Sequence, residues 1–251
     1  MKKLSLLISA AVTAMTLVSS SAFALQTSVP KFSTDKGGSV TGAAPSVYAE
    51  RVAYLCNQER KKAGLPELLY SPVVSKASQV RADEISVNYN SAHLRPNGSI
   101  CFTALDELNI TYSAVGENIA RGQNTPESAI KSWMESKIHR DNILNTKFTT
   151  IGVGVTDANG YISWSQFFIN TFTADSSAYL PRNFGDVNSD GAVDAVDASL
   201  VLTEYAVTSV NQPSILTDNQ KTLGNMNGDS VIDATDASLV LSMYAINSVI
   251  E

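Results

Sequence analysis

Two acidic segments near the C-terminus carry side chains whose types and spacing suit a hard cation. DVNSDGAVDAVDASLVLTEYA begins at Asp186, and NMNGDSVIDATDASLVLSMYA begins 39 residues later at Asn225. Oxygen ligands that alternate with other residues along a tightly curled loop converge on one ion, and Ca²⁺ prefers such ligands. The duplicated pattern therefore predicts two twelve-residue calcium loops, each holding one ion.

The two loops offer matching ligand positions but differ in quality. The first supplies Asp186, Asn188, Asp190, the Ala192 carbonyl, Asp194 and Asp197, and the second supplies Asn225, Asn227, Asp229, the Val231 carbonyl, Asp233 and Asp236. Position one of the second loop is therefore an amide, and position six is Ser230 where the first loop has Gly191. A non-glycine residue with positive φ is strained. With one carboxylate fewer as well, the second loop is predicted to bind calcium more weakly.

A second set of residues suits acid–base or metal chemistry. The chain has only two histidines, His93 and His139, and Glu117 lies between them in sequence. Two imidazoles and a carboxylate could hold zinc or another divalent ion, or could form an acid–base site. Spacing alone does not show that they converge, and Glu117 could instead only orient His139. No Gly-x-Ser-x-Gly nucleophile motif is present, and Cys56 falls at a core-like position.

The elements that must position these residues follow from hydrophobic spacing. Helices are predicted over 46–63 with Gly64 ending the helix, from Ser71-Pro72 to about Val87, and from Thr125-Pro126 onward. Strands are predicted over 150–155 and 161–168, with a hairpin turn at 157–160. The Ser-Pro and Thr-Pro pairs are typical of helix starts. Helices followed by a hairpin predict an α+β domain with helices packed on a sheet.

The chain ends and linkers indicate an exported protein. Lys2-Lys3, an apolar run from Leu4 to Val18 and Ala22-Phe23-Ala24 predict a secretory signal peptide over residues 1–24. No later segment is long and apolar enough to span a bilayer, so we expect an extracellular protein, associated with a scaffold or the cell surface. Small polar residues predict linkers at 25–45 and 172–182, which leaves domains at 46–171 and 183–251.

The net charge and the two cysteines bear on nucleic-acid binding and on disulfide formation. The formal net charge is −6 and no basic stripe is present, so a nucleic-acid partner is not expected. The two cysteines, Cys56 and Cys101, would be permitted to form a disulfide after export. Cys56 could equally be a small core hydrophobe in its helix, and the sequence favours two free thiols.

Residues 46–170 resemble the CAP superfamily (cysteine-rich secretory proteins, antigen five and plant pathogenesis-related proteins) in its bacterial SCP form. The matching segments occur in the family's order: Asn57-Gln58-Glu59-Arg60, Ala63-Gly64-Leu65, His93 with Arg95-Pro96-Asn97-Gly98, Gly116-Glu117-Asn118, Trp133 to Leu144, Ile151-Gly152-Val153-Gly154 and Trp164-Ser165-Gln166. The resemblance implies a three-layer α-β-α sandwich with a cleft of two His and two Glu. His93, Glu117 and His139 map directly. The second Glu falls at Ser136, and Glu135 is one residue away, about 100° around a helix.

Residues 183–251 resemble the type I dockerin family. A loop followed by a helix occurs twice, Pro181 and Gly185 interrupt any helix before the first loop, and position twelve is Asp. The resemblance implies a small all-α module that folds around two calcium ions and binds a cohesin module of a scaffoldin. The family's partner-selecting positions are Ala195, Val196, Ala234 and Thr235, which depart from the common Ser-Thr pair.

Three functions remain open from the sequence. The first is a non-catalytic cleft that binds an unknown small ligand or a metal, carried on a cellulosome-type scaffold in the context of polysaccharide degradation. The second is a peptidase-like hydrolase with His93 or His139 as general base. The third is a structural or adhesive module. No paired-carboxylate glycosidase motif is visible, and we favour the binding function.

Overall fold

The computed structural model describes residues 44–158, 160–172 and 174–250. The predicted signal peptide at 1–24 and nearly all of the predicted linker at 25–45 lie outside the described residues. None of the helices in the described part of the chain is long and apolar enough to cross a membrane.

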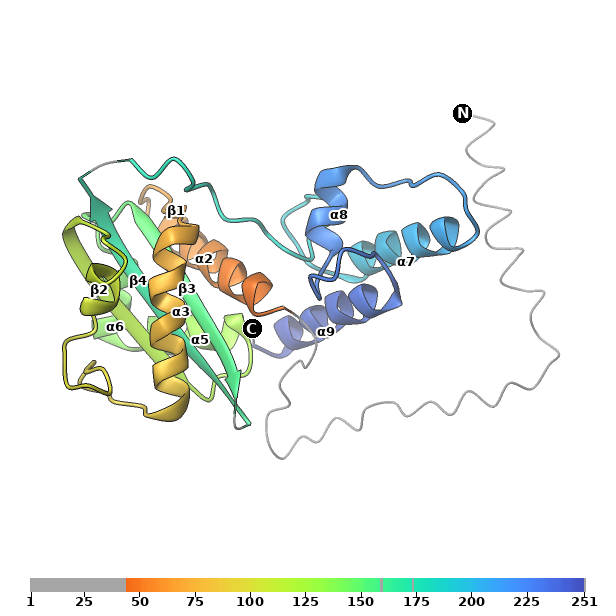
Figure 1. Ribbon diagram of the computed structural model, residues 1–251. Helices are drawn as coiled ribbons and strands as arrows, with labels where there is room; N and C mark the ends of the chain where they lie inside the picture. The colour runs from red at the N-terminus through yellow and green to blue at the C-terminus, as the bar shows by residue number, and fades with distance from the viewer. Residues whose placement is uncertain (1–43, 159, 173, 251) are drawn as a thin grey trace. The chain divides into compact units, whose positions relative to one another are not determined.

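Residues 45–171 form an α+β sandwich around a four-stranded sheet (Figure 1). Its elements are α2 (Pro45–Lys62), β1 (Leu69–Tyr70), α3 (Pro72–Val87), α4 (Thr103–Asp106), β2 (Tyr112–Arg121), α5 (Pro126–Glu135), α6 (Lys137–Ile143), β3 (Thr150–Ala158) and β4 (Tyr161–Thr171). The strand order is β1-β3-β4-β2, with β1 parallel to β3 and the other pairs antiparallel. The predicted α+β class is confirmed.

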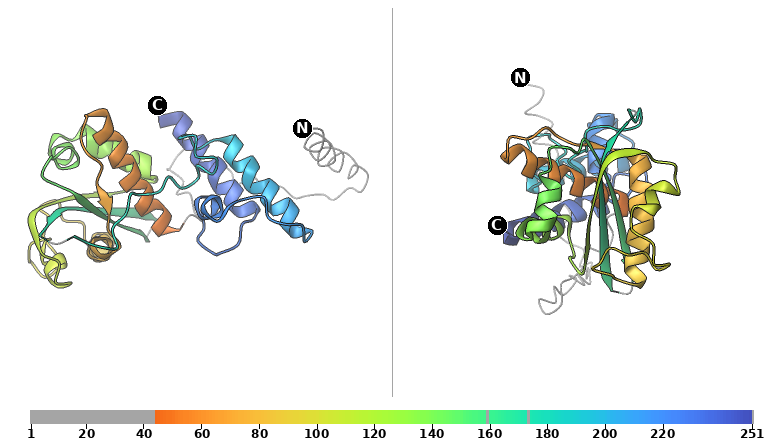
Figure 2. Two further views of the ribbon diagram at one scale, coloured as in Figure 1. Left: turned by 90° about the horizontal axis from the view of Figure 1, so that it is seen from above. Right: turned by 90° about the vertical axis from the view of Figure 1, so that its left-hand side faces the viewer.

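Helices cover both faces of the sheet, as the view along the sheet edge in Figure 2 shows. Because side chains alternate across a strand, β4 serves both cores. Phe167 and Ile169 pack with α3 and α4 on one face, whereas Trp164 and Phe168 pack with α2 and α5 on the other. The predicted three-layer α-β-α arrangement is therefore present.

Small residues let α3 lie directly on the sheet. A Cβ atom added at Gly154 would lie 2.2 Å from the carbonyl oxygen of Ser78, and one at Gly152 would lie 2.4 Å from the carbonyl carbon of Val74. Real Cβ contacts are never this short, so these two strand positions require glycine. The close approach fixes α3, which carries a residue of the candidate site.

The predicted helix starts agree with the structure. The hydroxyl of Ser71 accepts from the N–H of Val74 at the start of α3, and Thr125 forms a capping box with Ser128 at the start of α5. Gly64, with φ of 70°, follows the end of α2 as expected. The strands β1 and β2 and the short helices α4, α6 and α8 were not predicted.

Buried side-chain hydrogen bonds tie α2 to neighbouring loops. The side-chain amide of Asn57 pairs with both the N–H and the carbonyl of Leu68. The buried guanidinium of Arg60 donates to the carbonyls of Ile143 and Asn145. Because these groups are buried and satisfied, they serve the fold rather than a ligand.

The segment predicted as a linker at 172–182 contacts the sandwich. Tyr179 forms a β-bridge with Tyr70, and Arg182 forms an ion pair of 2.8 Å with Glu50 of α2. The Glu50 carboxylate also accepts from the Tyr179 hydroxyl. This segment is therefore fastened to the sandwich rather than extended from it.

Residues 183–250 form a loop–helix module of α7 (Ala195–Ser209), α8 (Asp218–Gly224) and α9 (Ala234–Ile250). A loop followed by a helix occurs twice, as predicted, and α8 precedes the second loop. Its core is apolar, with members Phe184, Val187, Val193, Ala198, Val201, Leu216, Met226, Ala237, Leu239, Val240 and Met243.

Candidate functional site

His93 is presented by a tight loop between α3 and α4. Leu94 and Ile100 form an isolated β-bridge, and the N–H of Arg95 donates to the carbonyl of Ser99, so the loop folds back on itself. His93 has φ of 61°, an unfavourable conformation for a non-glycine residue. The N–H of Cys101 donates to the carbonyl of His93, and this hydrogen bond helps to hold the conformation of His93.

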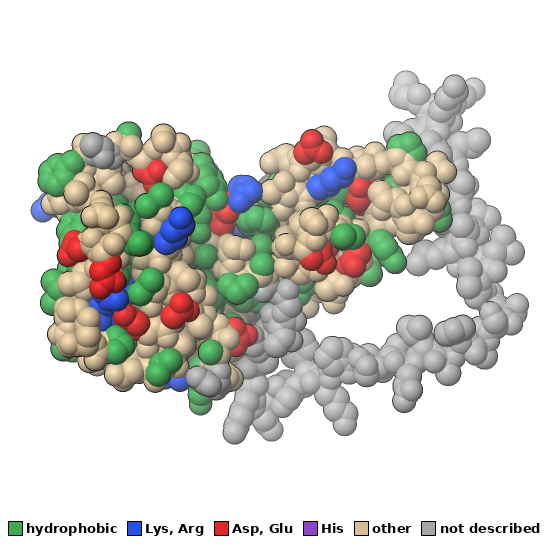
Figure 3. Space-filling view, viewed as in Figure 1, with side chains coloured by type: hydrophobic (Ala, Val, Ile, Leu, Met, Phe, Trp, Pro, Cys, Tyr) green, Lys and Arg blue, Asp and Glu red, His purple; other side chains and the backbone are tan. Residues whose placement is uncertain are grey.

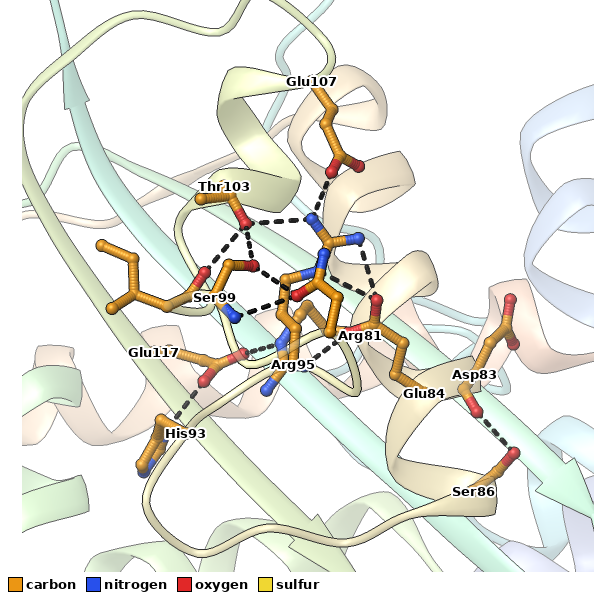
Figure 4. A network of polar contacts seen from close by, with 12 residues as sticks. Arg81, Asp83, Glu84, Ser86, His93, Arg95, Ser99, Thr103, Glu107 and Glu117 are labelled. Atoms are coloured by element: carbon orange, nitrogen blue, oxygen red, sulfur yellow. Dashed lines mark hydrogen bonds and ion pairs between the residues drawn. The ribbon is translucent and has the colours of Figure 1, made fainter.

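Glu117 lies on the edge strand β2 and receives donors from two directions (Figure 4). Nδ1 of His93 donates to one carboxylate oxygen at 2.6 Å, and Nε of Arg81 donates to the other at 2.8 Å. The Glu117 side chain is only 1% exposed. Because a carboxylate oxygen can only accept, the proton of the shared hydrogen bond lies on Nδ1 of His93.

Arginines anchor this pair to the rest of the sandwich. Arg81 of α3 also contacts Glu84 at 2.5 Å, and Arg95 of the loop contacts Glu84 at 2.8 Å (Figure 4). Arg95 reaches Glu107 as well, at 2.5 Å. The loop that carries His93 is thereby fixed to α3 through shared carboxylates.

Cys101 completes a compact cluster that the sequence did not predict. A ring nitrogen of His93, the sulfur of Cys101 and a carboxylate oxygen of Glu117 all lie within 4.8 Å of one another. Burial, and then the negative charge and hydrogen bonding of Glu117, raise the pKa of the Cys101 thiol to about 12. Cys101 and Cys56 are both free and buried, in agreement with the expectation of two thiols.

His139 lies on α6, beside the same strand. Its carbonyl accepts from the side-chain amide of Asn118, and burial, followed by the influence of His93, lowers the pKa of its imidazole. Glu117 contacts His93 and not His139, because its side chain lies on the α3 face of the sheet whereas α6 packs on the other. The alternative in which Glu117 orients His139 is therefore replaced by a Glu117–His93 pair.

Glu135 stands apart from this cluster. It is the exposed last residue of α5 and lines a groove with Leu55, Glu59 and Met134. Ser136, at the position of the family's second Glu, is the residue between α5 and α6. The structure brings His93, Glu117 and Cys101 together and leaves Glu135 outside.

A groove of about 400 Å³ opens beside the cluster. His93, Cys101 and Glu117 lie at one part of its wall, and Leu94, Ile100 and Phe102 supply apolar surface. Because Nδ1 of His93 donates to Glu117, the neutral ring keeps a lone pair on Nε2. The arrangement can accept a hydrogen bond, take up a proton or bind a metal ion beside an apolar wall.

The first calcium-type loop is already curled around its acidic side chains. Both carboxylate oxygens of Asp186 accept backbone N–H groups, from Asp190 and Gly191, at 3.0 Å. Asp197 accepts from Val187 at 2.8 Å and from Asp194 at 2.9 Å. Positions one and twelve are thus bound to the same turn.

The second loop repeats this arrangement, with Asp236 accepting from Met226 at 2.8 Å and from Asp233 at 3.1 Å. Ser230 has φ of 72°, as predicted for position six. Position four also has positive φ in both loops, at Ser189 (61°) and Gly228 (73°). Each loop therefore has one strained serine, and strain does not distinguish them. The remaining difference is Asn225 in place of Asp186.

Buried acids make the loops suitable for a cation. Asp197 and Asp236 are fully buried, and burial raises the pKa of both carboxyl groups. Within the described residues neither forms an ion pair, and the space-filling view shows acidic side chains with little basic surface over the visible face of this module (Figure 3). Carboxylate, amide and carbonyl oxygens are the donors that Ca²⁺ prefers, so the residues present fit calcium.

The expected partner-selecting residues are accessible. Ala195 and Val196 begin α7, and Ala234 and Thr235 begin α9. All four are exposed. They lie directly after position nine of each loop, where loop geometry sets the direction of the following helix.

Comparison with protein families assigns both parts of the chain. Residues 53–171 match the cysteine-rich secretory protein (CAP) family, and residues 184–243 match the type I dockerin domain. The two matches are consecutive and correspond to the sandwich and to the loop–helix module.

Individual relatives cover only part of this chain. It is 38% identical over 137 residues to "Uncharacterized protein YkwD" of Bacillus subtilis (strain 168), covering 54% of this chain and 52% of that protein. It is 26% identical over 106 residues to "Uncharacterized membrane protein YlbC" of the same strain, covering 42% of this chain and 31% of the other. An extracellular SCP-domain protein from Bacillus anthracis str. Ames aligns with 26% identity and a TM-score of 0.47, covering 51% of this chain and 41% of that one. The chain thus spans about half of one curated relative and about a third of the other.

Proposed function

We propose that the protein is an extracellular component of a cellulosome-type assembly. This proposal rests on its two parts: residues 53–171 belong to the CAP family, and residues 184–243 are a type I dockerin domain. The dockerin domain binds two calcium ions and docks on a cohesin module of a scaffoldin. The CAP domain presents the groove beside His93 to a ligand, in an assembly that degrades polysaccharide.

The curled acidic loops are the observation that carries the docking function. In each loop the position-twelve aspartate is buried and accepts backbone N–H groups from both ends of the loop. A calcium ion would be held by Asp186, Asn188, Asp190, Ala192, Asp194 and Asp197, and by the matching six residues of the second loop from Asn225 to Asp236. When bound, it supplies the positive charge that these acids lack.

The two repeats present matching apolar side chains for a partner. Leu202 and Leu241, 39 residues apart, are 44% and 42% exposed, and Tyr205 and Tyr244 are 42% and 44% exposed. Because both helices carry the same surface, either repeat can meet the cohesin. Apolar and aromatic anchors of this kind contribute most of the affinity in protein interfaces.

Cohesin capture tests this proposal. Immobilised cohesin modules should retain the full chain in calcium and release it in chelator. Leu202→Asp or Leu241→Asp alone should leave capture through the other repeat, and the double variant should lose it. His93→Ala, a change in the CAP domain and not among the docking residues, is the matched control and should be retained. Calcium-independent capture, or none by any cohesin type, contradicts the docking function.

For the groove we favour ligand binding over nucleophilic catalysis. The thiolate is the reactive form of cysteine, and the Cys101 thiol is held protonated by burial and by Glu117, with its pKa raised to about 12. The wall of Leu94, Ile100 and Phe102 instead suits a ligand with an apolar body and a hydrogen-bond donor for Nε2 of His93. Binding of a fluorescent apolar probe should weaken in Ile100→Ser and in His93→Ala, and should be unaffected by Glu135→Ala. Equal binding in all variants contradicts this assignment.

The 2.6 Å contact between His93 and Glu117 favours a second candidate, a peptidase-like hydrolase. A carboxylate that holds Nδ1–H prepares Nε2 to take a proton from water or substrate. His93→Gln should then lower kcat/KM on a peptide library by about 100-fold or more, whereas His139→Gln should lower it less. An absence of turnover in the wild-type chain leaves binding as the function of the groove.

A further inference from the structure

We propose that Cys101 makes the groove a site for a thiophilic metal ion such as Zn²⁺, held by His93, Cys101 and Glu117 rather than by the two histidines. The inference deepens the proposed ligand-binding role of the groove and rests on it, since the ion is then part of what the groove binds. It assigns the cleft to a mixed nitrogen, sulfur and oxygen donor set.

The distances suit a single ion. One ligand atom from each of the three residues lies within 4.8 Å of the other two. Typical zinc bonds are about 2.0–2.3 Å long, so two ligands of one ion lie about 3.5 Å apart in a tetrahedral site. The longest separation must shorten by about 1 Å, and the 2.6 Å contact between Nδ1 of His93 and Glu117 must open by a similar amount. Side-chain rotation can supply both movements. His139 is not a member of this group among the described residues.

The surroundings hold the ligands in place. Arg81 binds one oxygen of Glu117 at 2.8 Å and leaves the other to face His93. Cys101 is 4% exposed and packs with Ala104 and Leu105 of α4. His93 is fixed by the loop that Arg95 anchors to Glu84. Three ligands with supporting contacts and a groove at the remaining side resemble an open zinc site.

The donor set also decides which metal binds. A thiolate selects zinc, cobalt or cadmium over magnesium and calcium, which prefer oxygen. The ion must displace the thiol proton of Cys101, which is released to solvent, and must take the place of the proton between Nδ1 of His93 and Glu117, so that the neutral ring then carries its proton on Nε2. One carboxylate and one thiolate then balance the charge of a divalent ion. The same chain would therefore keep calcium in its dockerin loops and a softer ion in its groove.

Cobalt titration of the full chain in saturating calcium tests the site, because calcium occupies the dockerin loops. We expect one Co²⁺ per chain with a near-ultraviolet sulfur-to-cobalt charge-transfer band. Cys101→Ser should abolish the band and weaken Co²⁺ binding at least tenfold, whereas Cys56→Ala and His139→Ala should retain both. A wild-type chain with no such band, or a band lost in His139→Ala but kept in Cys101→Ser, overturns the proposal.

A second measurement needs no variant. X-ray absorption of the Zn²⁺-loaded chain should show one sulfur atom about 2.3 Å from zinc. A zinc shell of nitrogen and oxygen ligands alone also overturns the proposal. Cohesin capture is measured on the same samples, so a failure of metal binding with intact capture is distinguished from a failure of the docking function. If the apolar probe binds in the absence of metal, ligand binding by the groove does not depend on the metal site.

Discussion

Glu117 is the residue on which the site depends most. Its buried carboxylate joins α3, the His93 loop and Cys101 through Arg81, Nδ1 of His93 and the thiol. A buried charge is costly unless each partner is present. Glu117 therefore contributes to the fold and to the chemistry of the groove through the same two oxygens.

Replacing Glu117 by Gln should destabilise the CAP domain by about 3 kcal/mol, because the buried Arg81 loses its fully buried anion and keeps only Glu84, whose side chain is 17% exposed. Urea unfolding followed by circular dichroism measures the change. Glu107→Gln is the control, since Glu107 pairs with Arg95 but its side chain is 56% exposed. It should change stability much less. Equal losses in the two variants would show that the buried pair with Arg81 is not the stabilising contact.

Only part of this cluster could be predicted from sequence. His93 and Glu117 were found because histidine is rare in the chain and because the family motif carries both. Cys101 and Arg81 were not, since each comes from another element and joins the cluster only through the fold. An arginine in the middle of the buried side of α3 was the one available signal, because such a charge needs a buried partner. The sequence separation of Arg81 and Glu117 does not identify Glu117 as the partner of this arginine.

The two calcium-type loops differ at position one, and we expect this difference to determine which loop binds calcium more tightly. Asp186 carries a charge that Asn225 lacks, whereas the strained serines Ser189 and Ser230 balance each other. Asp186→Ala should therefore weaken calcium binding by the chain more than Asn225→Ala, and Asn225→Asp should strengthen it. Calorimetry with calcium measures all three.

Ser189→Gly and Ser230→Gly should each stabilise their loop by up to about 1 kcal/mol. A gain in only one of them would mean that strain does distinguish the loops.

At the scale of elements, periodic helices were predicted well and β2 was not. α2, α3 and α5 each begin with a proline in the first turn, and α3 and α5 also have side-chain caps. Their predicted starts agree with the structure. β2 reads YSAVGENIAR, in which Gly, Glu and Asn interrupt any alternation. It is an edge strand, and side chains cover its free carbonyls: Asn142 donates to Glu117 and Trp133 donates to Ile119. Tertiary contacts and not propensity fix this strand.

The contact of α3 with the sheet predicts the effect of a single methyl group. Gly154→Ala should destabilise the CAP domain by about 3 kcal/mol, since its Cβ would lie 2.2 Å from the Ser78 carbonyl and backbone must move. Gly160→Ala is the control: it has φ of 77° but nothing within 4 Å of the new Cβ. It should cost only about 1 kcal/mol, from the backbone alone. The unfolding temperatures of the two variants compare the cost of a steric clash with α3, in Gly154→Ala, with the cost of backbone strain alone, in Gly160→Ala.

In the dockerin domain, the connection after α7 depends on Glu204. This carboxylate accepts from the Ser214 hydroxyl and from the N–H groups of Ile215 and Leu216. Burial raises its pKa, but these hydrogen bonds outweigh burial and hold the pKa below its ordinary value. Met243 occupies the matching position of the second repeat, so the contact is found once.

A lowered folded-state pKa gives a definite pH dependence. The stability from Glu204 is complete above the unfolded-state pKa of about 4.3 and is lost as pH falls through its lower folded-state pKa. In saturating calcium, the wild-type chain should therefore lose its stability advantage over Glu204→Gln as the solution is acidified below about pH 4. Unfolding midpoints of the two proteins across this range measure the difference. A constant gap at all pH values contradicts the assignment.

At the scale of the whole molecule, charge is strongly segregated. Residues 183–251 contain ten acidic residues and one basic residue, a formal charge of −9, whereas the whole chain has −6. Residues 1–182 therefore carry a formal charge of +3. Self-repulsion of like charges destabilises a compact state. Two calcium ions would reduce the formal charge of the dockerin region to −5, so its folding should depend on ions more than that of the CAP domain.

In the absence of calcium, a high salt concentration should partly restore the stability that calcium gives the dockerin region. In chelator, raising the KCl concentration from about 0.01 M to about 1 M shortens the screening length from about 30 Å to about 3 Å. The unfolding midpoint of the dockerin region should therefore rise, because repulsion among its acids is screened. In saturating calcium the rise should be smaller, since the ions have already removed part of that charge. Calorimetry of the full chain under the four conditions measures both responses. A salt response that is as large with calcium as without it would mean that the acids are balanced by contacts within the chain, and that calcium acts by coordinating the loops rather than by relieving repulsion.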